Sequence, residues 1–348
     1  SLAVDGAQRD SGFEAHGTGL RVELGDADTY CISTVVEARV GGANDEGFTA
    51  RPGMVSTTCE PEGFRRITYF VDRPANRSLF DVTLVGDRAV FPVMLSNGNR
   101  VDSGVWSDGR EWERFVDPVD KPSYLFAVVA GDLREMQSVH RTMSGREITL
   151  TVVASPDAIS GAAFALDILD TVMTFDEQQS GVEHDLDHLI FAAIPGYPDA
   201  TEYHGLMFFD EQILIADERG HTDDDLLLIT ANVAHEYGHH VRGNRITVSS
   251  WGQLALKEGL TVLFQNDVRR HLMGDVGRIM DLLDLRRVQY PEEITIGAPV
   301  LQGEVADPHQ LYTRTTYLKG GEIFRMMRTA VGDATWRSII DAFVARYD

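Results

Sequence analysis

Cysteine is scarce in this sequence of 348 residues, which contains only Cys31 and Cys59. Two thiols are too few for a disulfide framework or a thiolate metal cluster in a chain of this length. The first five residues, 1–5, also lack the basic start and apolar core of a signal peptide. Secretion is therefore unsupported, and the cytoplasm, a reducing compartment, fits best.

Long hydrophobic runs and positive charge are also missing. No apolar run approaches the roughly 18 residues that a membrane-spanning helix needs, which excludes a helical membrane protein. The 31 basic residues are outnumbered by 54 acidic ones, for a net charge of -23. This charge repels nucleic-acid phosphates and anionic lipids, so neither is expected as a partner, and it favours cationic ligands. No feature of the sequence predicts an oligomeric state.

The predicted secondary structure changes near residue 132. Residues 30–132 consist of short strands and turns, and the alternating stretch 80–95, broken at Gly86-Asp87, predicts a hairpin. Beyond it we predict a helix around 164–175, a buried strand over 186–194, an edge strand within 205–216 and mostly helices from 222 onward. This pattern predicts an α+β protein with two domains, 1–133 and 134–348, that pack together.

One predicted helix carries the strongest chemical signal. Thr222 and Asp225 form a capping signature, and the helix that follows contains His235, Glu236 and His239. Residues four apart lie about 6 Å apart along a helix and roughly 40° apart around it, so two imidazoles can converge on one cation. Glu236 is offset between them, where its carboxylate can hold the attacking water instead of the metal.

A second predicted helix supplies a third ligand. Glu258 lies 19 residues after His239, which is far enough for a turn and an antiparallel return. Two histidines and one carboxylate leave a coordination position open for water. An open position indicates catalysis instead of a purely structural metal.

Other histidines are weaker candidates. His184 and His188 flank a strand-like run, where a spacing of four residues corresponds to roughly 13 Å. His240 is turned by about 100° from His239 around the helix and should miss the ion. The remaining histidines considered are more typical of surface or loop positions: His204, His221, His271 and His309.

These motifs stand in segments that closely resemble one known family. The segments are 235–239 (HEYGH), 243–247 (GNRIT), 251–261 (WGQLALKEGLT), 59–65 (CEPEGFR), 95–100 (LSNGNR), 121–126 (KPSYLF) and 317–322 (YLKGGE). Together they resemble the aminopeptidase N family of gluzincin zinc peptidases, most closely its bacterial alanyl aminopeptidases. The resemblance extends over about 320 residues, far more than a chance match of the HExxH motif would give.

The resemblance implies a fold and a set of roles. The fold would be an antiparallel β domain followed by a thermolysin-like zinc peptidase domain with a mixed sheet and helices. One zinc ion per chain would be held by His235, His239 and Glu258, and Glu236 would act as general base and then as proton donor. Tyr317 would donate a hydrogen bond to the oxyanion. Glu60 and Glu202 would accept the α-ammonium of a peptide or aminoacyl substrate with a free amino terminus.

Several positions depart from the family pattern. Residues 199–203 read DATEY, so Glu202 has altered neighbours, and Thr58 and Tyr203 are expected to change substrate binding. Relative to the family, the chain begins inside the β domain and stops at Asp348 without the large helical domain that roofs the cleft. The leading hypothesis is a zinc aminopeptidase. The alternatives are a catalytically weak relative used as a binding or assembly module, and a zinc amide hydrolase with a remodelled amine site.

Overall fold

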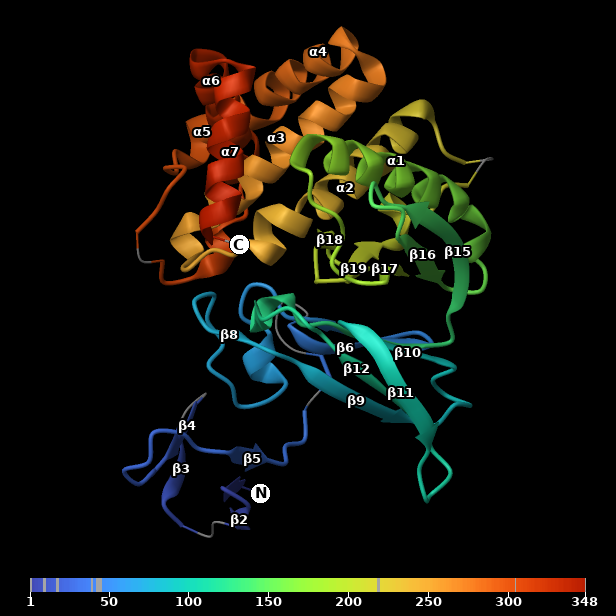
Figure 1. Ribbon diagram of the computed structural model, residues 1–348, viewed down its shortest axis with the longest axis vertical. Helices are drawn as coiled ribbons and strands as arrows, with labels where there is room; N and C mark the ends of the chain where they lie inside the picture. Colours follow the sequence, from blue (N-terminus) through green and yellow to red (C-terminus); the bar gives the residue numbers. More distant parts are fainter. Residues whose placement is uncertain are drawn as a thin grey trace.

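The computed structural model describes residues 2–8, 11–16, 19–38, 40–41, 46–217, 220–303 and 305–347. Ser1 and Asp348, the outer ends of the two predicted domains, lie outside these ranges. A β-rich amino-terminal part and a part with a mixed sheet and helices lie against each other (Figure 1). The predicted α+β fold class is confirmed.

The amino-terminal part contains small antiparallel sheets. Its main sheet has the order β10-β14-β7-β6, and a second sheet has the order β11-β12-β9. The strands of this part are β1 (Leu2–Val4), β2 (Ala7–Gln8), β3 (Phe13–His16), β4 (Gly19–Val22), β5 (Ile32–Thr34), β6 (Gly47–Arg51), β7 (Met54–Thr58), β8 (Arg77–Ser78), β9 (Asp81–Gly86), β10 (Val93–Ser96), β11 (Asn99–Val105), β12 (Glu111–Val116), β13 (Lys121–Pro122) and β14 (Val128–Gly131).

The hairpin predicted over 80–95 is wrong. Strand β9 pairs with β12, with Asp81 opposite Val116, and β10 pairs with β14, with Val93 opposite Gly131. The two halves of the segment therefore belong to different sheets. Alternation identifies each strand, but the choice of partner depends on distant residues.

The second part is built on one five-stranded mixed sheet of order β15-β16-β17-β19-β18. Its strands are β15 (Arg134–Arg141), β16 (Glu147–Ala154), β17 (His188–Ile194), β18 (Ala200–Thr201) and β19 (Leu206–Asp210). The pairs β16·β17 and β17·β19 are parallel, and the outer pairs are antiparallel. The segment predicted as an edge strand is thus the interior strand β19, and the short β18 covers its edge.

The helices of this part are α1 (Ala163–Ser180), α2 (Asp223–Gly238), α3 (Leu254–Met273), α4 (Asp275–Asp284), α5 (Tyr290–Ile296), α6 (Gly320–Val331) and α7 (Asp333–Tyr347). Two further helical segments matter for the site, η6 (His240–Arg245) and η10 (Thr315–Lys319). Helices α1 and α2 lie on one side of the sheet (Figure 1), and α3 packs against α2. Within the described residues, no helix is long and apolar enough to cross a membrane.

Strand β17 shows how the two parts are joined. Its side chains alternate: Leu189 and Phe191 enter the core beneath the helices, whereas Ile190 and Ala192 enter a second core. That second core also contains Phe126 and other apolar residues of the β domain. Because a strand sends successive side chains to opposite faces, β17 is buried on both sides. The predicted packing of the two parts against each other is confirmed.

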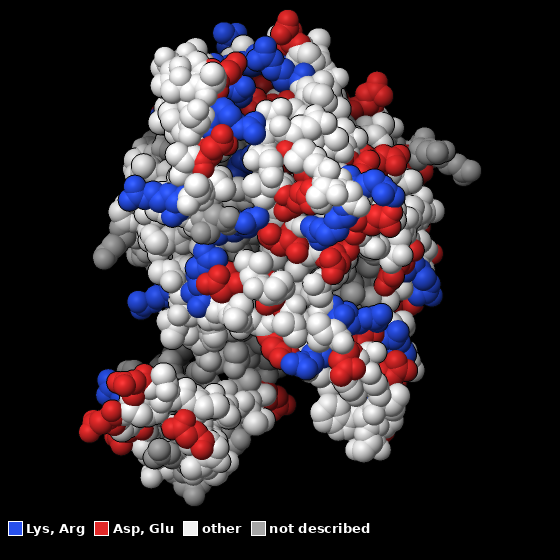
Figure 2. All heavy atoms as spheres, in the orientation of Figure 1, with Lys and Arg blue, Asp and Glu red and all other residues white. Residues whose placement is uncertain are grey.

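The negative charge is not gathered into one patch on the face in view. Figure 2 shows acidic and basic side chains intermingled over that face. Recognition of a cationic group there would therefore depend on particular carboxylates and their burial more than on a broad surface field.

Candidate active site

Helix α2 begins as its sequence predicts. The backbone amide of Thr222 donates to Oδ2 of Asp225 at 2.7 Å, and the Thr222 hydroxyl accepts from the backbone amide of Asp225. The helix then lies close to α3, because a Cβ at Gly238 would stand 2.6 Å from the ring of Phe264. A glycine at this position lets the histidine-bearing helix approach the helix that carries Glu258.

Three potential ligand atoms from these two helices form a nearly equilateral triangle. Nε2 of His235 and Nε2 of His239 are 3.2 Å apart, and Oε2 of Glu258 lies 3.2 Å from the first and 3.3 Å from the second. Tetrahedral zinc with bonds of about 2.0–2.1 Å places its ligand atoms roughly 3.3–3.4 Å apart. The triangle therefore has the size that zinc requires.

The hydrogen bonds of the two imidazoles also suit the binding of a cation. Nδ1 of His239 donates to the carbonyl of Arg242 at 3.0 Å, and Nδ1 of His235 donates to Oε1 of Gln265 at 3.1 Å. In the neutral rings both Nε2 atoms then carry lone pairs that face each other and a carboxylate oxygen. Such a set of acceptors has no internal donor, and a metal ion would satisfy all three.

Glu236 stands beside this triangle as an unpaired carboxylate. It is buried, and its Oε2 has no hydrogen-bond partner among the described residues. Burial, followed by the charges of Glu202 and Glu258, raises the pKa of Glu236 well above its usual value. A carboxylate in this state readily accepts a proton.

Tyr317 reaches the same place from η10. Its ring stacks on the ring of His235 with centroids 5.9 Å apart. The approach depends on Gly259, next to Glu258, because a Cβ there would lie 2.7 Å from the backbone of Gly320. Burial raises the pKa of Tyr317 well above its usual value, so the hydroxyl stays protonated and able to donate.

Glu60 and Glu202 come together from the two domains, but they do so around a lysine. Nζ of Lys257 lies 2.8 Å from Oε1 of Glu60 and 3.1 Å from Oε1 of Glu258, and it also donates to Glu202. The Lys257 side chain is 1% exposed. Three carboxylates thus surround one ammonium group next to the metal triangle.

The charges in this group are unequal. Burial, then the negative charge of Glu202, raises the pKa of Glu60 to about 7. Burial, the largest single effect, would raise the pKa of Glu202, but the charges of Lys257 and His239 and the hydrogen bond from Lys257 together lower that pKa. Of the three carboxylates that contact Lys257, Glu60 therefore takes up a proton most easily when no further cation is present.

Thr58 and Tyr203 lie close in sequence to the carboxylates Glu60 and Glu202. Thr58 is buried at the end of β7, two residues before Glu60. Tyr203 is fully buried, and its hydroxyl accepts from the backbone amide of Cys59 at 3.0 Å and contacts the hydroxyl of Tyr197. Tyr203 therefore ties the segment that carries Glu202 to the segment that carries Glu60.

Sequence reasoning missed Lys257 and the burial of His204. The chain has only three lysines against 28 arginines, and a lysine directly before a predicted ligand was the available signal. His204 lies in a loop, as expected, between β18 and β19, but it is only 1% exposed and hydrogen-bonds Asp117 at 2.9 Å. A buried acid partner, which no local pattern reveals, keeps this histidine inside the protein. His240 misses the triangle, as predicted.

The family is shown by comparison with known proteins. The model of the peptidase family M1 domain matches residues 164–348, and that of the peptidase M1 N-terminal domain matches residues 45–125. The chain therefore belongs to peptidase family M1, a family of metallopeptidases, and the resemblance inferred from its motifs is confirmed.

Individual relatives agree with this assignment. The chain is 40% identical to an aminopeptidase N of Caulobacter vibrioides over all of its own length and 41% of the relative's. It is 36% identical to an aminopeptidase N of Escherichia coli over 87% of its own length and 35% of the relative's. The solved structure of Legionella pneumophila aminopeptidase A in complex with aspartic acid matches all of the chain with a TM-score of 0.90 and 29% identity. The chain spans about two fifths of the length of these proteins.

Proposed function

We propose that this chain is a zinc-dependent aminopeptidase that hydrolyses the first peptide bond of substrates with a free amino terminus. The observation that carries the proposal is the triangle of His235, His239 and Glu258 beside the paired carboxylates Glu60 and Glu202. One zinc ion bound at the triangle would polarise the scissile carbonyl and acidify a water molecule. The chain's own residues supply the rest.

Glu236 and Tyr317 have complementary tasks in this proposal. Glu236 takes a proton from the attacking water and passes it to the leaving amine, which its unpaired oxygen and raised pKa favour. Tyr317 donates a hydrogen bond to the oxyanion that forms on the carbonyl, a contribution of about 3 kcal/mol. Its raised pKa keeps that donor in place at neutral pH.

Charge balance supports amine recognition. Glu60, Glu202 and Glu258 surround the single ammonium of Lys257, and the buried carboxylate of Glu236 is a fourth acidic group in the same site. When all four are ionised, three negative charges remain, which one zinc ion and one substrate ammonium balance. An ammonium beside Glu60 would also favour its charged form, since an opposite charge lowers the pKa of a carboxyl group. Tyr203, whose hydroxyl contacts Cys59 and Tyr197, acts as a positioning residue for the segment that carries Glu60, and Thr58 lies on that segment at the end of β7.

The test is a panel of aminoacyl anilides with free and acetylated amines, assayed with and without a zinc chelator. We expect turnover of the free amines only, and loss of that turnover with chelator. Equal turnover of acetylated anilides would favour the zinc amide hydrolase, and zinc binding without any turnover would favour the binding module. We also propose a cytoplasmic location, which is supported by the scarcity of cysteine.

A further inference from the structure

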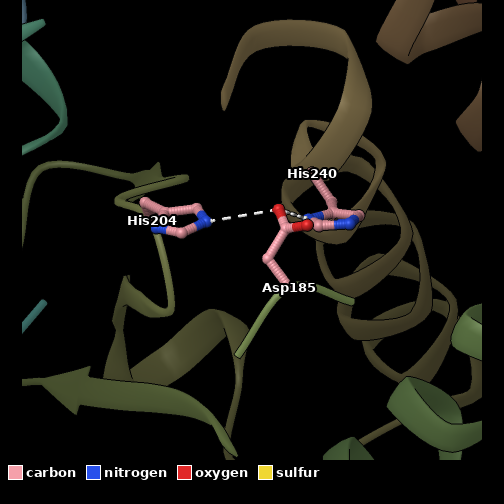
Figure 3. Close-up of side chains that lie close together, drawn as sticks. All are labelled: Asp185, His204 and His240. Atoms are coloured by element: carbon pink, nitrogen blue, oxygen red, sulfur yellow. Dashed lines mark ion pairs between the residues drawn. The ribbon is translucent and has the colours of Figure 1, made fainter. Parts of the chain in front are cut away.

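A second cluster of metal-ligating side chains lies outside the active site. Asp185 precedes β17, His204 precedes β19, and His240 begins η6 directly after His239. Figure 3 shows the Asp185 carboxylate between the two imidazole rings. One ligand atom from each residue lies within 4.8 Å of the other two.

The cluster is tight and largely buried. Oδ2 of Asp185 is 3.7 Å from Nε2 of His204 and 3.9 Å from Nδ1 of His240. The side chains of His204 and His240 are 2% and 1% exposed, and that of Asp185 is 17% exposed. The histidines are thus shielded from solvent, whereas the Asp185 side chain is partly exposed.

Each of the three residues uses its other polar atom elsewhere. Nδ1 of His204 donates to Asp117 at 2.9 Å, and Nε2 of His240 donates to the carbonyl of Glu183 at 3.3 Å. Oδ1 of Asp185 accepts from Arg245 at 3.2 Å. Hydrogen bonds of this kind fix the tautomers and the orientation of metal ligands.

The remaining ligand atom of each residue faces the other two residues of the cluster. Nε2 of His204, Nδ1 of His240 and Oδ2 of Asp185 are buried and have no hydrogen-bond partner in the part of the chain that the structure describes. In neutral rings whose other nitrogens donate, all three are acceptors. Buried acceptors without a donor are costly, and a cation at their centre would satisfy all of them at once.

We propose that Asp185, His204 and His240 form a second zinc site. Two imidazole nitrogens and one carboxylate oxygen suit zinc, whereas magnesium and calcium require shells made mostly of oxygen. The Asp185 contacts of 3.7 and 3.9 Å exceed the roughly 3.3 Å of a tetrahedral site, so the side chains would move inward when the ion binds. The positive charges nearby are already opposed, Arg245 by Asp185 and Lys121 by Asp117.

The second ion would stabilise the arrangement of the active-site segments. His240 adjoins the ligand His239, and His204 lies two residues after Glu202, so one ion links the end of the metal helix to the amine-binding segment. Asp185 anchors both to the start of β17. The competing explanation is a proton: a protonated His204 would pair with Asp185 and leave no room for metal.

Zinc counting on the purified full chain separates these explanations. After zinc loading and gel filtration, plasma emission spectroscopy should find about two equivalents of zinc per chain in the wild type. It should find one in His239→Ala, one in His240→Gln and none in the double variant His239→Ala/His240→Gln. Glutamine keeps an amide donor near the position of Nε2, so the contact to Glu183 is retained while the ligand nitrogen is removed. His204→Asn does the same for the contact to Asp117 and should also leave one equivalent.

His188→Gln is the matched control, a nearby histidine outside the cluster, and should retain two equivalents. Added zinc should also raise the melting temperature of His239→Ala but not that of the double variant. The proposal is overturned if the wild type holds one equivalent that His239→Ala abolishes, or if His240→Gln and His204→Asn both keep two. Because His239→Ala alone tests the first centre, a failure of either site is recognised separately.

Discussion

Nζ of Lys257 lies 2.8 Å from Oε1 of Glu60, so a lysine on helix α3 of the peptidase domain neutralises a carboxylate that belongs to the β domain. The same ammonium group contacts Glu202 and Glu258. One side chain thus contacts residues of both domains, the two carboxylates of the proposed amine site and one ligand of the proposed metal triangle.

Removal of this ammonium should destabilise the fold. Lys257→Met leaves three buried carboxylates without their cation, and we expect a loss of about 3 kcal/mol in the free energy of unfolding by urea. Lys319→Met is the matched control, because Lys319 is 35% exposed and pairs with a similarly exposed Glu293. That surface pair should contribute less than about 1 kcal/mol. Equal effects of the two variants would contradict a central role for Lys257.

The first metal centre can be separated from the general base. His239→Ala should lose the zinc equivalent of the triangle together with turnover, since two protein ligands hold the ion poorly. Glu236→Gln should keep that zinc and lose turnover, because its carboxylate is no ligand. Zinc content and anilide turnover measured on the same preparations check both outcomes. Equal loss of zinc in the two variants would make Glu236 a structural residue.

Tyr317→Phe removes one hydroxyl and keeps the ring that stacks on His235. We expect kcat to fall by about two to three powers of ten, with zinc content and melting temperature unchanged. A loss of stability at normal kcat would instead identify Tyr317 as a packing residue.

The amine site makes a substrate-dependent prediction. Glu60→Gln and Glu202→Gln should each lower kcat/KM for free-amine substrates by about ten- to hundredfold, the equivalent of about 1.5–3 kcal/mol for a hydrogen bond to a charged group. Any residual turnover of acetylated substrates should be the same in variants and wild type. Glu62→Gln, on the same segment but paired with Arg65 near the surface, is the control and should change kcat/KM less than twofold. If Glu62→Gln matches the other two, the carboxylates act only through overall charge.

A pH effect on stability is expected at Asp281 of helix α4, which belongs to neither metal cluster. Burial raises the pKa of Asp281 to about 6. The positive charges of Arg269 and Arg278 lower this pKa, and the negative charge of Asp284 raises it, but burial is the largest effect. Because the folded state holds this proton more tightly than the unfolded state, the stabilisation is present below the unfolded pKa and is lost as pH rises through about 6. Between pH 5 and pH 7 the wild type should lose about 1 kcal/mol relative to Asp281→Asn in urea unfolding. A pH-independent difference would contradict the raised pKa.

Local patterns in the sequence were sufficient for much of the molecule. Thr222 and Asp225 predicted the start of α2, and the spacing of His235 and His239 predicted that their imidazoles converge. Both follow from the geometry of one helix, which is the same in any protein. The spacing of Glu258 from His239 made it the candidate third ligand, and the family segments then supplied Tyr317, Glu60 and Glu202, because homologous motifs preserve positions that are distant in sequence.

Tertiary structure decided the features that depend on partners far along the chain. The pairing of β9 with β12 and of β10 with β14 replaced a hairpin that local alternation favoured equally well. The burial of Lys257 among carboxylates from both domains, and the meeting of Asp185, His204 and His240, likewise join segments that no local period relates. Backbone geometry fixes contacts within a few residues, whereas contacts between distant segments are set by the packing of the whole core.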